Sequence, residues 1–109
     1  MNQLLEFSSK YNLKNKKIIE IGCGKGAMLD IIEEAKMEAY GLEYSAESVN
    51  IANIEDRKVI KGFIEDLEKI KFMPFSGFVC LNFLEHLPNP KLAINKIYNN
   101  LNEDGIGLV

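Results

Sequence analysis

The sequence predicts an α/β protein built on a doubly wound parallel sheet, and three observations lead to this prediction. Short apolar runs alternate with longer stretches in which apolar residues recur at helical spacing. The apolar runs are nearly continuous, as expected of strands that are buried on both faces. The first run also passes through three alternate glycines directly into a helical pattern. Such alternation is typical of parallel strands joined by right-handed crossovers.

The expected elements follow one another along the chain without a linker or an internal repeat. Helices are expected over 2–13, 26–37, 46–54 (with Ser45 as N-cap) and 91–101. Strands are expected over 17–21, 39–43, 58–61 and 77–81, and a fifth opens at 106 after a turn at Asp104–Gly105. Residues 63–70 are expected to form a weak helix or an irregular crossover.

The composition is that of an ordinary globular domain without a strong charge. The 109 residues are 47% hydrophobic and 27% charged, with a formal net charge of −3. That length suits one domain with a real core. Lysines gather only at Lys14–Lys17, which we interpret as a solvated lead-in to the first strand. Because a basic stripe is missing, neither nucleic acid nor a membrane surface is expected as a partner.

Neither the cysteines nor the apolar segments indicate an extracellular or membrane protein. Cys23 and Cys80 are far apart and lack the spacing of metal ligands, so both are expected to pack in a protein from a reducing compartment. Residues 1–10 lack the apolar centre of a signal peptide. No segment approaches the ~20 apolar residues of a membrane helix. A cytoplasmic protein without a bound metal is the expectation.

The segment Ile18–Ala27 carries the strongest functional signal. Glycines at 22, 24 and 26 free the turn after the first strand of side chains, so a ligand can approach the backbone closely. Many nucleotide-binding sheets use such a loop. Glu20 narrows the choice, because a carboxylate at this place would repel a pyrophosphate but attract a cationic amine. S-adenosylmethionine carries an ammonium, a sulfonium and no phosphate, so the loop favours this methyl donor over a dinucleotide.

Four segments together resemble the class I S-adenosylmethionine-dependent methyltransferases of the small-molecule type. They are Glu20–Gly26 (E-x-G-x-G-x-G), the acid Glu43 at the end of the second strand, Gly62–Leu67 and Leu81–Pro88. The resemblance implies a Rossmann-like sheet of seven strands in the order 3-2-1-4-5-7-6. Residues 1–109 would supply strands one to five, as an S-adenosylmethionine-binding domain truncated after strand five and incomplete at its C-terminus.

The resemblance also implies which residues would form the site. The cofactor-binding residues would be Glu20, Gly22, Cys23, Gly24, Gly26, Glu43, Tyr44, Phe63, Ile64, Asn82 and Phe83. Glu20 would hold the methionine ammonium, and Glu43 would accept both ribose hydroxyls. Tyr44 either lies against the adenine or simply packs. His86 is the one candidate for a general base, although a cap for the loop before Pro88 is the favoured role, because methyl transfer needs little acid–base help.

Two positions depart from the family pattern. Phe63 stands where the family usually has an Asp that binds the adenine amine, so either Glu65 replaces that contact or Phe63 covers the ring. Ser76 follows Phe75 where the family usually has another Asp. At the other end, the chain stops at Val109 inside an apolar strand, which would leave an open sheet edge. Either the chain is a fragment, the interpretation that we favour, or a second copy covers the edge as a homodimer.

Three functions are therefore considered. The leading hypothesis is an enzyme that transfers a methyl group from S-adenosylmethionine to a small-molecule acceptor, which the sequence does not identify. The alternative is a cofactor-binding fragment that catalyses nothing, because the stop at Val109 removes the acceptor side. An NAD-linked oxidoreductase domain comes third, because Glu20 and the segment Glu85–Pro88 are unexplained by it.

Overall fold

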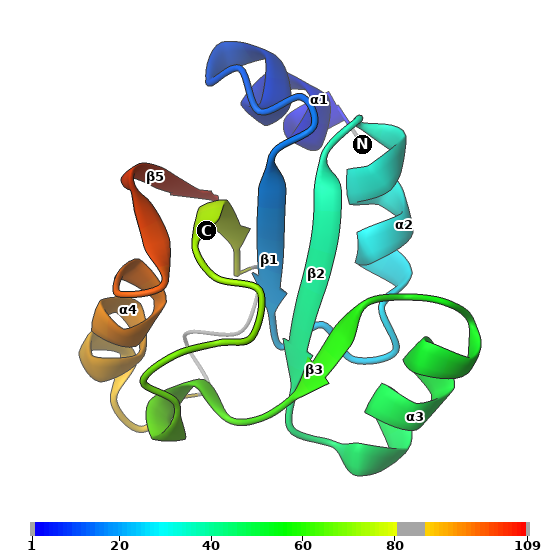
Figure 1. Ribbon diagram of the computed structural model, residues 1–109, viewed down its shortest axis with the longest axis vertical. Helices are drawn as coiled ribbons and strands as arrows, with labels where there is room; N and C mark the ends of the chain where they lie inside the picture. The colour runs from blue at the N-terminus through cyan, green and yellow to red at the C-terminus, as the bar shows by residue number, and fades with distance from the viewer. Residues whose placement is uncertain (1, 81–86, 109) are drawn as a thin grey trace.

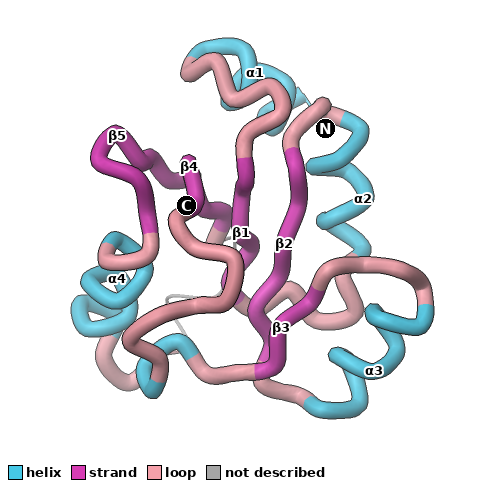
Figure 2. Tube along the Cα trace, viewed as in Figure 1, coloured by secondary structure: helices cyan, strands magenta, loops and turns pink. Residues whose placement is uncertain are grey.

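A computed structural model of the chain describes residues 2–80 and 87–108, which form one parallel sheet with helices on both sides (Figure 1). The strands are β1 (Lys17–Ile21), β2 (Glu38–Glu43), β3 (Val59–Lys61), β4 (Phe75–Val79) and β5 (Leu101–Leu108). The helices are α1 (Asn2–Lys10), α2 (Ala27–Glu34), α3 (Ala46–Ile54), α4 (Pro90–Tyr98) and the 3-10 turn η1 (Ile64–Asp66). The strand order is β3-β2-β1-β4-β5, and every pair is parallel. This confirms the predicted fold class and strand order (Figure 2).

Two apolar clusters bury the two faces of the sheet. One joins the sheet to α1, α2 and α3 and includes Ile18, while the other joins it to α4 and η1 and includes Ile19 and Ile21. Successive residues of β1 thus enter opposite clusters, because side chains alternate across a strand. This accounts for the nearly continuous apolar run in the sequence. Figure 1 shows α2 and α3 on one side of the sheet and α4 on the other.

Side-chain caps begin two of the helices, and the sequence predicted the first of them. The Oγ of Ser45 accepts a hydrogen bond from Ser48 N at 3.3 Å and caps α3 as predicted. The Oδ1 of Asn89 accepts one from Leu92 N at 3.0 Å and caps α4. Pro90 occupies the first turn of α4, where its missing N–H costs nothing. The helix thus begins at Pro90, one residue earlier than expected, and ends at Tyr98 instead of residue 101.

The first two helices are shorter than predicted. They end at Lys10 and Glu34 instead of residues 13 and 37. Asn12 and Lys36 follow these ends with φ angles of 54° and 69°, in the left-handed region that stops a helix. The predicted crossover after β3 is mostly irregular, with η1 as its one regular turn in the described part.

The predicted strand over 77–81 was placed too late. In the structure β4 begins at Phe75, whose N–H donates to Asn100 O at 2.9 Å and which pairs with Leu101. The strand prediction relied on an unbroken apolar run, and the partly buried Ser76 interrupts that run. Leu81, the last residue of the predicted strand, lies outside the described residues.

The fifth strand begins at Leu101, which the sequence pattern had placed in the preceding helix. Its register against β4 moves from Phe75 opposite Leu101 to Gly77 opposite Ile106. The extra residues of β5 form an irregularity that contains Asp104–Gly105, so the predicted turn lies within the strand. Leu101 packs against the apolar cluster from the strand instead of from α4. In the described part of the chain, no helix is long and apolar enough to cross a membrane.

Asn100 is a buried polar residue that joins the crossover before β4 to the turn before β5. Its Oδ1 accepts from Ile70 N at 2.6 Å, and its Nδ2 donates to Glu68 O at 3.2 Å and Lys96 O at 2.9 Å. Its exposed fraction is 1%. These bonds satisfy backbone groups of both segments, so the side chain holds two distant parts of the chain together.

We expect Asn100→Ala to lower the free energy of unfolding by about 2–3 kcal/mol, because it leaves a buried N–H and two carbonyls without this partner. Urea unfolding at neutral pH measures the change. Asn95→Ala on the exposed side of α4 is the control and should change stability by at most about 0.5 kcal/mol. Equal effects of the two substitutions would contradict this role of Asn100.

Candidate functional site

The glycine loop follows β1 at the carboxyl end of the sheet. Gly22, Gly24 and Gly26 have φ angles of 74°, 58° and 94°, which side chains rarely permit. The N–H groups of Gly22 and Cys23 both donate to Leu42 O, at 2.8 and 3.2 Å. A Cβ placed on Gly24 would meet no atom within 4 Å. The glycine at 24 is therefore required by its backbone angle, and the side of the loop that it presents is open to a ligand.

Glu43 ties this loop to the end of β2. Its Oε1 accepts from Gly24 N at 2.9 Å, and its Oε2 accepts from Ser45 N at 3.0 Å. The residue is 7% exposed. Each carboxylate oxygen can accept more than one hydrogen bond, so both remain able to accept from ligand hydroxyls. The acid predicted from the sequence as a ribose ligand thus also holds the loop in place.

Glu20 lies on β1 just before the loop and is only 8% exposed. Its Oε1 is buried and has no hydrogen-bond partner among the described residues. Burial first, and then the charge of Glu43, raises the pKa of Glu20 to about 7. A buried carboxylate without a partner is costly. A cationic group brought to this place would supply both the missing hydrogen bond and the missing charge.

Tyr44 and Phe63 come together beside the loop, from the ends of β2 and β3. Their ring centroids are 6.0 Å apart with an interplanar angle of 31°. Tyr44 is 65% exposed, so part of its ring surface is open to solvent. A small hollow lies here, lined by Ile21, Gly22, Leu42, Tyr44, Gly62, Phe63 and Ile64. Ile64 itself is 1% exposed and belongs to the core, so its side chain supports the hollow from below.

Gly41 is a site residue that the sequence prediction missed. It lies on β2 opposite Glu20, and a Cβ there would overlap the Cys23 Sγ. A glycine inside a strand pattern signals such a close approach, although it does not identify the neighbour. Cys23 is 8% exposed, and burial followed by the charges of Glu20 and Glu43 raises the pKa of its thiol to about 12. The thiol stays protonated at neutral pH and packs in the apolar cluster, as predicted.

The structure brings most of the predicted site residues to one edge of the sheet. Glu20, the glycine loop, Glu43, Tyr44 and Phe63 lie at the carboxyl ends of β1, β2 and β3, where open α/β sheets bind ligands. Asn82, Phe83 and His86 lie outside the described residues, and their roles stay predictions. The described ranges contain no group of acidic, His and Cys side chains suited to a metal ion.

Comparison with known proteins identifies the family. The family model of the methyltransferase domain matches residues 1–109. The chain therefore belongs to the methyltransferase domain family, which confirms the resemblance found in its sequence.

The curated relatives are considerably longer than this chain. It is 25% identical over 104 residues to the ubiquinone biosynthesis O-methyltransferase of Actinobacillus pleuropneumoniae serotype 7, a match that covers 86% of this chain and 44% of the relative. It is 28% identical over 90 residues to the enzyme of that name from Idiomarina loihiensis, covering 75% of this chain and 36% of the relative. The chain thus spans less than half the length of these relatives.

Solved structures share the fold. The plantazolicin methyltransferase BpumL, in complex with a triazolic desmethylPZN analog and SAH, superposes with a TM-score of 0.79 at 21% identity over 95% of this chain and 43% of that one. The sugar N-methyltransferase KedS8 from Streptoalloteichus gives a TM-score of 0.76 at 16% identity over 96% of this chain and 44% of that one. The TM-scores establish a common architecture, and at identities this low the comparison extends to the fold alone.

We expect the stability of the ligand-free protein to fall as the pH rises from about 4.5 to 7. The pKa of Glu20 is 4.5 ordinarily and about 7 in the folded chain, so the folded state binds the proton more tightly in this window. Above pH 7 both states are ionised, and the loss stays at roughly 3 kcal/mol. Glu20→Gln should remove this fall, as measured by urea unfolding between pH 4.5 and 8.

Glu34→Gln, at an exposed acid near the end of α2, is the control for this experiment and should retain the fall. If Glu20→Gln differed from the natural chain by the same free energy at every pH, the assignment of the titration to Glu20 would be wrong.

We expect Gly41→Ala to destabilise the fold by about 1–3 kcal/mol, because the added methyl overlaps the Cys23 Sγ and lies 3.1 Å from Leu29 Cδ1. Thermal and urea unfolding measure this cost. In a Cys23→Ala background the cost should be smaller, since the sulfur is gone. Equal costs in the two backgrounds would show that another contact limits the space at position 41.

Proposed function

We propose that the protein is an S-adenosylmethionine-dependent methyltransferase that acts on a small molecule. The observation that carries this proposal is the pair of buried acids, Glu20 and Glu43, at the ends of adjacent strands on either side of a glycine loop. One acid has both oxygens bonded to backbone N–H groups, and the other has an oxygen without a partner in the described part of the chain. A ligand with hydroxyls at one end and a cationic amine at the other matches this difference.

Three parts of the proposed ligand, the ammonium, the ribose and the base, would have counterparts in the site. Glu20 would accept from the methionine ammonium, which would remove the cost of its buried oxygen. Glu43 would accept from the ribose hydroxyls while it continues to hold Gly24. Tyr44 and Phe63 would lie against the base through stacking. These rings suit the role of Phe63 as a cover for the base. Glu65 stays the alternative contact for the adenine amine, since its Oε1 is buried without a partner among the described residues.

The bound cofactor supplies a methyl group on a sulfonium that is open to in-line attack. The residues of this chain would bind and orient the donor and keep water from it, which is how positioning accelerates a displacement. Such a reaction demands little proton transfer from the protein. His86 therefore remains a proposal as a general base, for acceptors that must lose a proton.

The acceptor is proposed only by class. The curated relatives are named as O-methyltransferases of ubiquinone biosynthesis, and KedS8 is named as a sugar N-methyltransferase. A small organic acceptor methylated on oxygen or nitrogen agrees with these names and with the net charge of −3. We also propose a cytoplasmic location.

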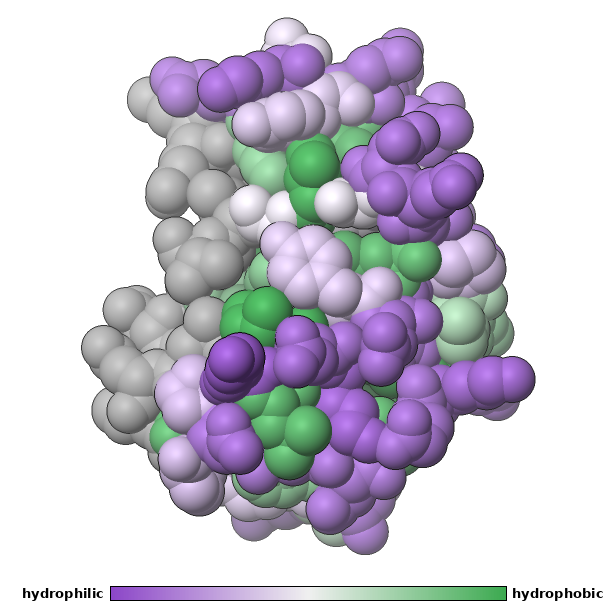
Figure 3. Space-filling model, turned by 90° about the vertical axis from the view of Figure 1, so that its left-hand side faces the viewer, coloured by the Kyte–Doolittle hydropathy of each residue, from purple (hydrophilic) through white to green (hydrophobic). Residues whose placement is uncertain are grey.

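A homodimer through β5 is a further proposal about partners. β5 is the last strand of the described sheet, so its outer edge has no strand neighbour there. Leu92 and Tyr98 on α4 are 37% and 50% exposed. Figure 3 shows apolar surface interspersed with polar groups on the side of the molecule that carries α4 and β5.

The second candidate function is cofactor binding without methyl transfer. It is favoured by the position of the described site residues, since the loop, Glu20, Glu43 and the two rings would all contact the donor and none is assigned to an acceptor. Binding of S-adenosylhomocysteine would be the same under both proposals. A methyl-transfer assay on protein that has been shown to bind S-adenosylhomocysteine separates the two proposals, because only the enzyme would transfer the methyl group.

Calorimetric titration with S-adenosylhomocysteine tests the proposed site. We expect micromolar binding by the natural chain and at least tenfold weaker binding by Glu43→Ala, roughly what the loss of charge-assisted hydrogen bonds causes. Glu34→Ala, at an exposed acid on α2, should bind like the natural chain. Tighter binding of NADH, or no binding of S-adenosylhomocysteine by a folded chain, would contradict the proposal.

A further inference from the structure

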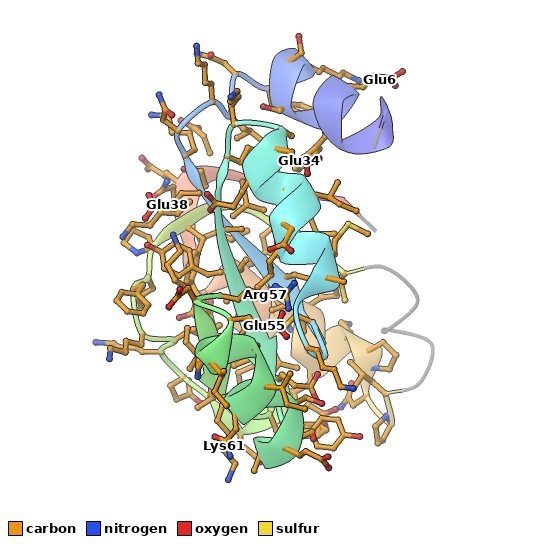
Figure 4. The ribbon with its side chains drawn as sticks, turned by 90° about the vertical axis from the view of Figure 1, so that its right-hand side faces the viewer. Glu6, Glu34, Glu38, Glu55, Arg57 and Lys61 are labelled. Atoms are coloured by element: carbon orange, nitrogen blue, oxygen red, sulfur yellow. The ribbon has the colours of Figure 1, made fainter. Side chains whose placement is uncertain are left out.

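Arg57, the chain's single arginine, reaches from the turn between α3 and β3 to the start of α2. Its Nε and Nη2 donate to the two carboxylate oxygens of Asp30, at 3.1 and 2.7 Å. Its Nη1 donates to the Lys25 carbonyl at 3.2 Å and lies 2.6 Å from Glu55 Oε2. Figure 4 shows the side chain directed toward the first turn of α2. One guanidinium thus joins the glycine loop, α2 and the end of α3.

The contact with Lys25 falls on the part of the loop that β2 does not hold. The N–H groups of Gly22, Cys23 and Gly24 donate to β2, to Leu42 O or to Glu43. The second half of the loop contains Lys25, whose carbonyl accepts from Arg57. β2 therefore fixes the first half of the loop. The second half is held by the bond from Arg57 to the Lys25 carbonyl and by the bond from Gly26 N to Cys23 O at 3.0 Å.

The start of α2 is not capped by the side chain of its own N-cap residue. Gly26 is the N-cap residue and offers no side-chain cap. A Cβ at Gly26 would lie 2.8 Å from Arg57 Cδ, so the arginine stem packs on the face of this glycine. The Arg57 side chain is 19% exposed, and its hydrogen bond to Asp30 raises the pKa of the guanidinium, so the charge is retained. The hydrogen bonds from Arg57 also lower the pKa of Asp30, which keeps the pair ionised.

We propose that Arg57 is a positioning residue for the cofactor loop. It holds the Lys25 carbonyl and the Gly26 backbone in the conformation that the Gly22–Gly24 half needs in order to meet a ligand. This inference rests on the proposed function, since it assigns the loop to S-adenosylmethionine. A loop that is ordered before binding loses less conformational entropy when the ligand arrives, and affinity rises accordingly.

A purely structural role would look different. If Arg57 only stabilised the fold, its loss would weaken ligand binding no more than any other substitution of equal cost. Asn100 provides that comparison, because it lies between η1, β4 and α4 on the other face of the sheet. We expect Asn100→Ala to lower the free energy of unfolding and to leave the conformation of the glycine loop unchanged.

The test measures two properties of Arg57→Met, which keeps the stem against Gly26 and removes the guanidinium. Binding of S-adenosylhomocysteine should weaken by about threefold to tenfold, the effect of ordering a short segment at binding. Amide hydrogen exchange at Gly24 and Gly26, whose N–H groups donate to Glu43 Oε1 and Cys23 O, should become faster, while exchange at Ile19 in β1 stays slow. Asn100→Ala should retain the affinity and the loop protection of the natural chain.

Arg57→Lys serves if the methionine variant does not fold, because it keeps the charge beside Asp30 and Glu55 but not the fork that also reaches the Lys25 carbonyl. It should show the same changes to a smaller degree. Unchanged loop exchange and affinity in the arginine variants, or equal losses in Asn100→Ala, would overturn the proposal. A third outcome separates the two proposals. If the arginine variants show faster loop exchange but the natural chain does not bind S-adenosylhomocysteine, the positioning role of Arg57 holds and the proposed function is contradicted.

Discussion

The bonds made by the Glu43 carboxylate are the interaction on which the site depends. One oxygen accepts from Gly24 in the loop after β1, and the other accepts from Ser45, the residue that caps α3. A single buried side chain thus fixes the end of β2, the loop that follows β1 and the start of the next helix. The sheet brings these segments together, but Glu43 sets their relative position. The bonds that hold the site together are therefore made within the chain itself.

The two acids of the site show how burial gives the same side chain different properties. Glu43 has backbone donors for both oxygens, whereas Glu20 has a buried oxygen without a partner in the described residues. Glu43 consequently fixes the backbone around the site, whereas Glu20 offers a buried acceptor that a cationic group could bind. Arg57 completes the arrangement from outside, where it is bonded to Asp30 and to the Lys25 carbonyl. It lies on the far side of the loop and does not neutralise Glu20.

The sequence predicted those features that depend on neighbours in the chain. The extent of β1, the Ser45 cap and the alternation of strands and helices follow from local patterns, and the structure confirms them. Leu101 was assigned wrongly because an apolar residue at the end of a helix pattern also fits the start of a strand. The roles of Gly41 and Arg57 could not be predicted, because each depends on a contact with a residue that is distant in sequence. Gly41 leaves room for Cys23, and Arg57 bonds to Asp30. The meeting of Tyr44 with Phe63 depends likewise on the pairing of β2 with β3.

The unpartnered oxygen of Glu20 links the lifetime of the protein to its ligand. A buried oxygen without a partner lowers the free energy of unfolding. A ligand that bonds to this carboxylate binds only the folded state, so it raises the free energy of unfolding again. Proteases act on the fraction of molecules that is transiently unfolded, and this fraction shrinks as the ligand concentration rises. On the proposed function, abundance of the protein in the cell would follow the supply of the methyl donor without any dedicated regulator.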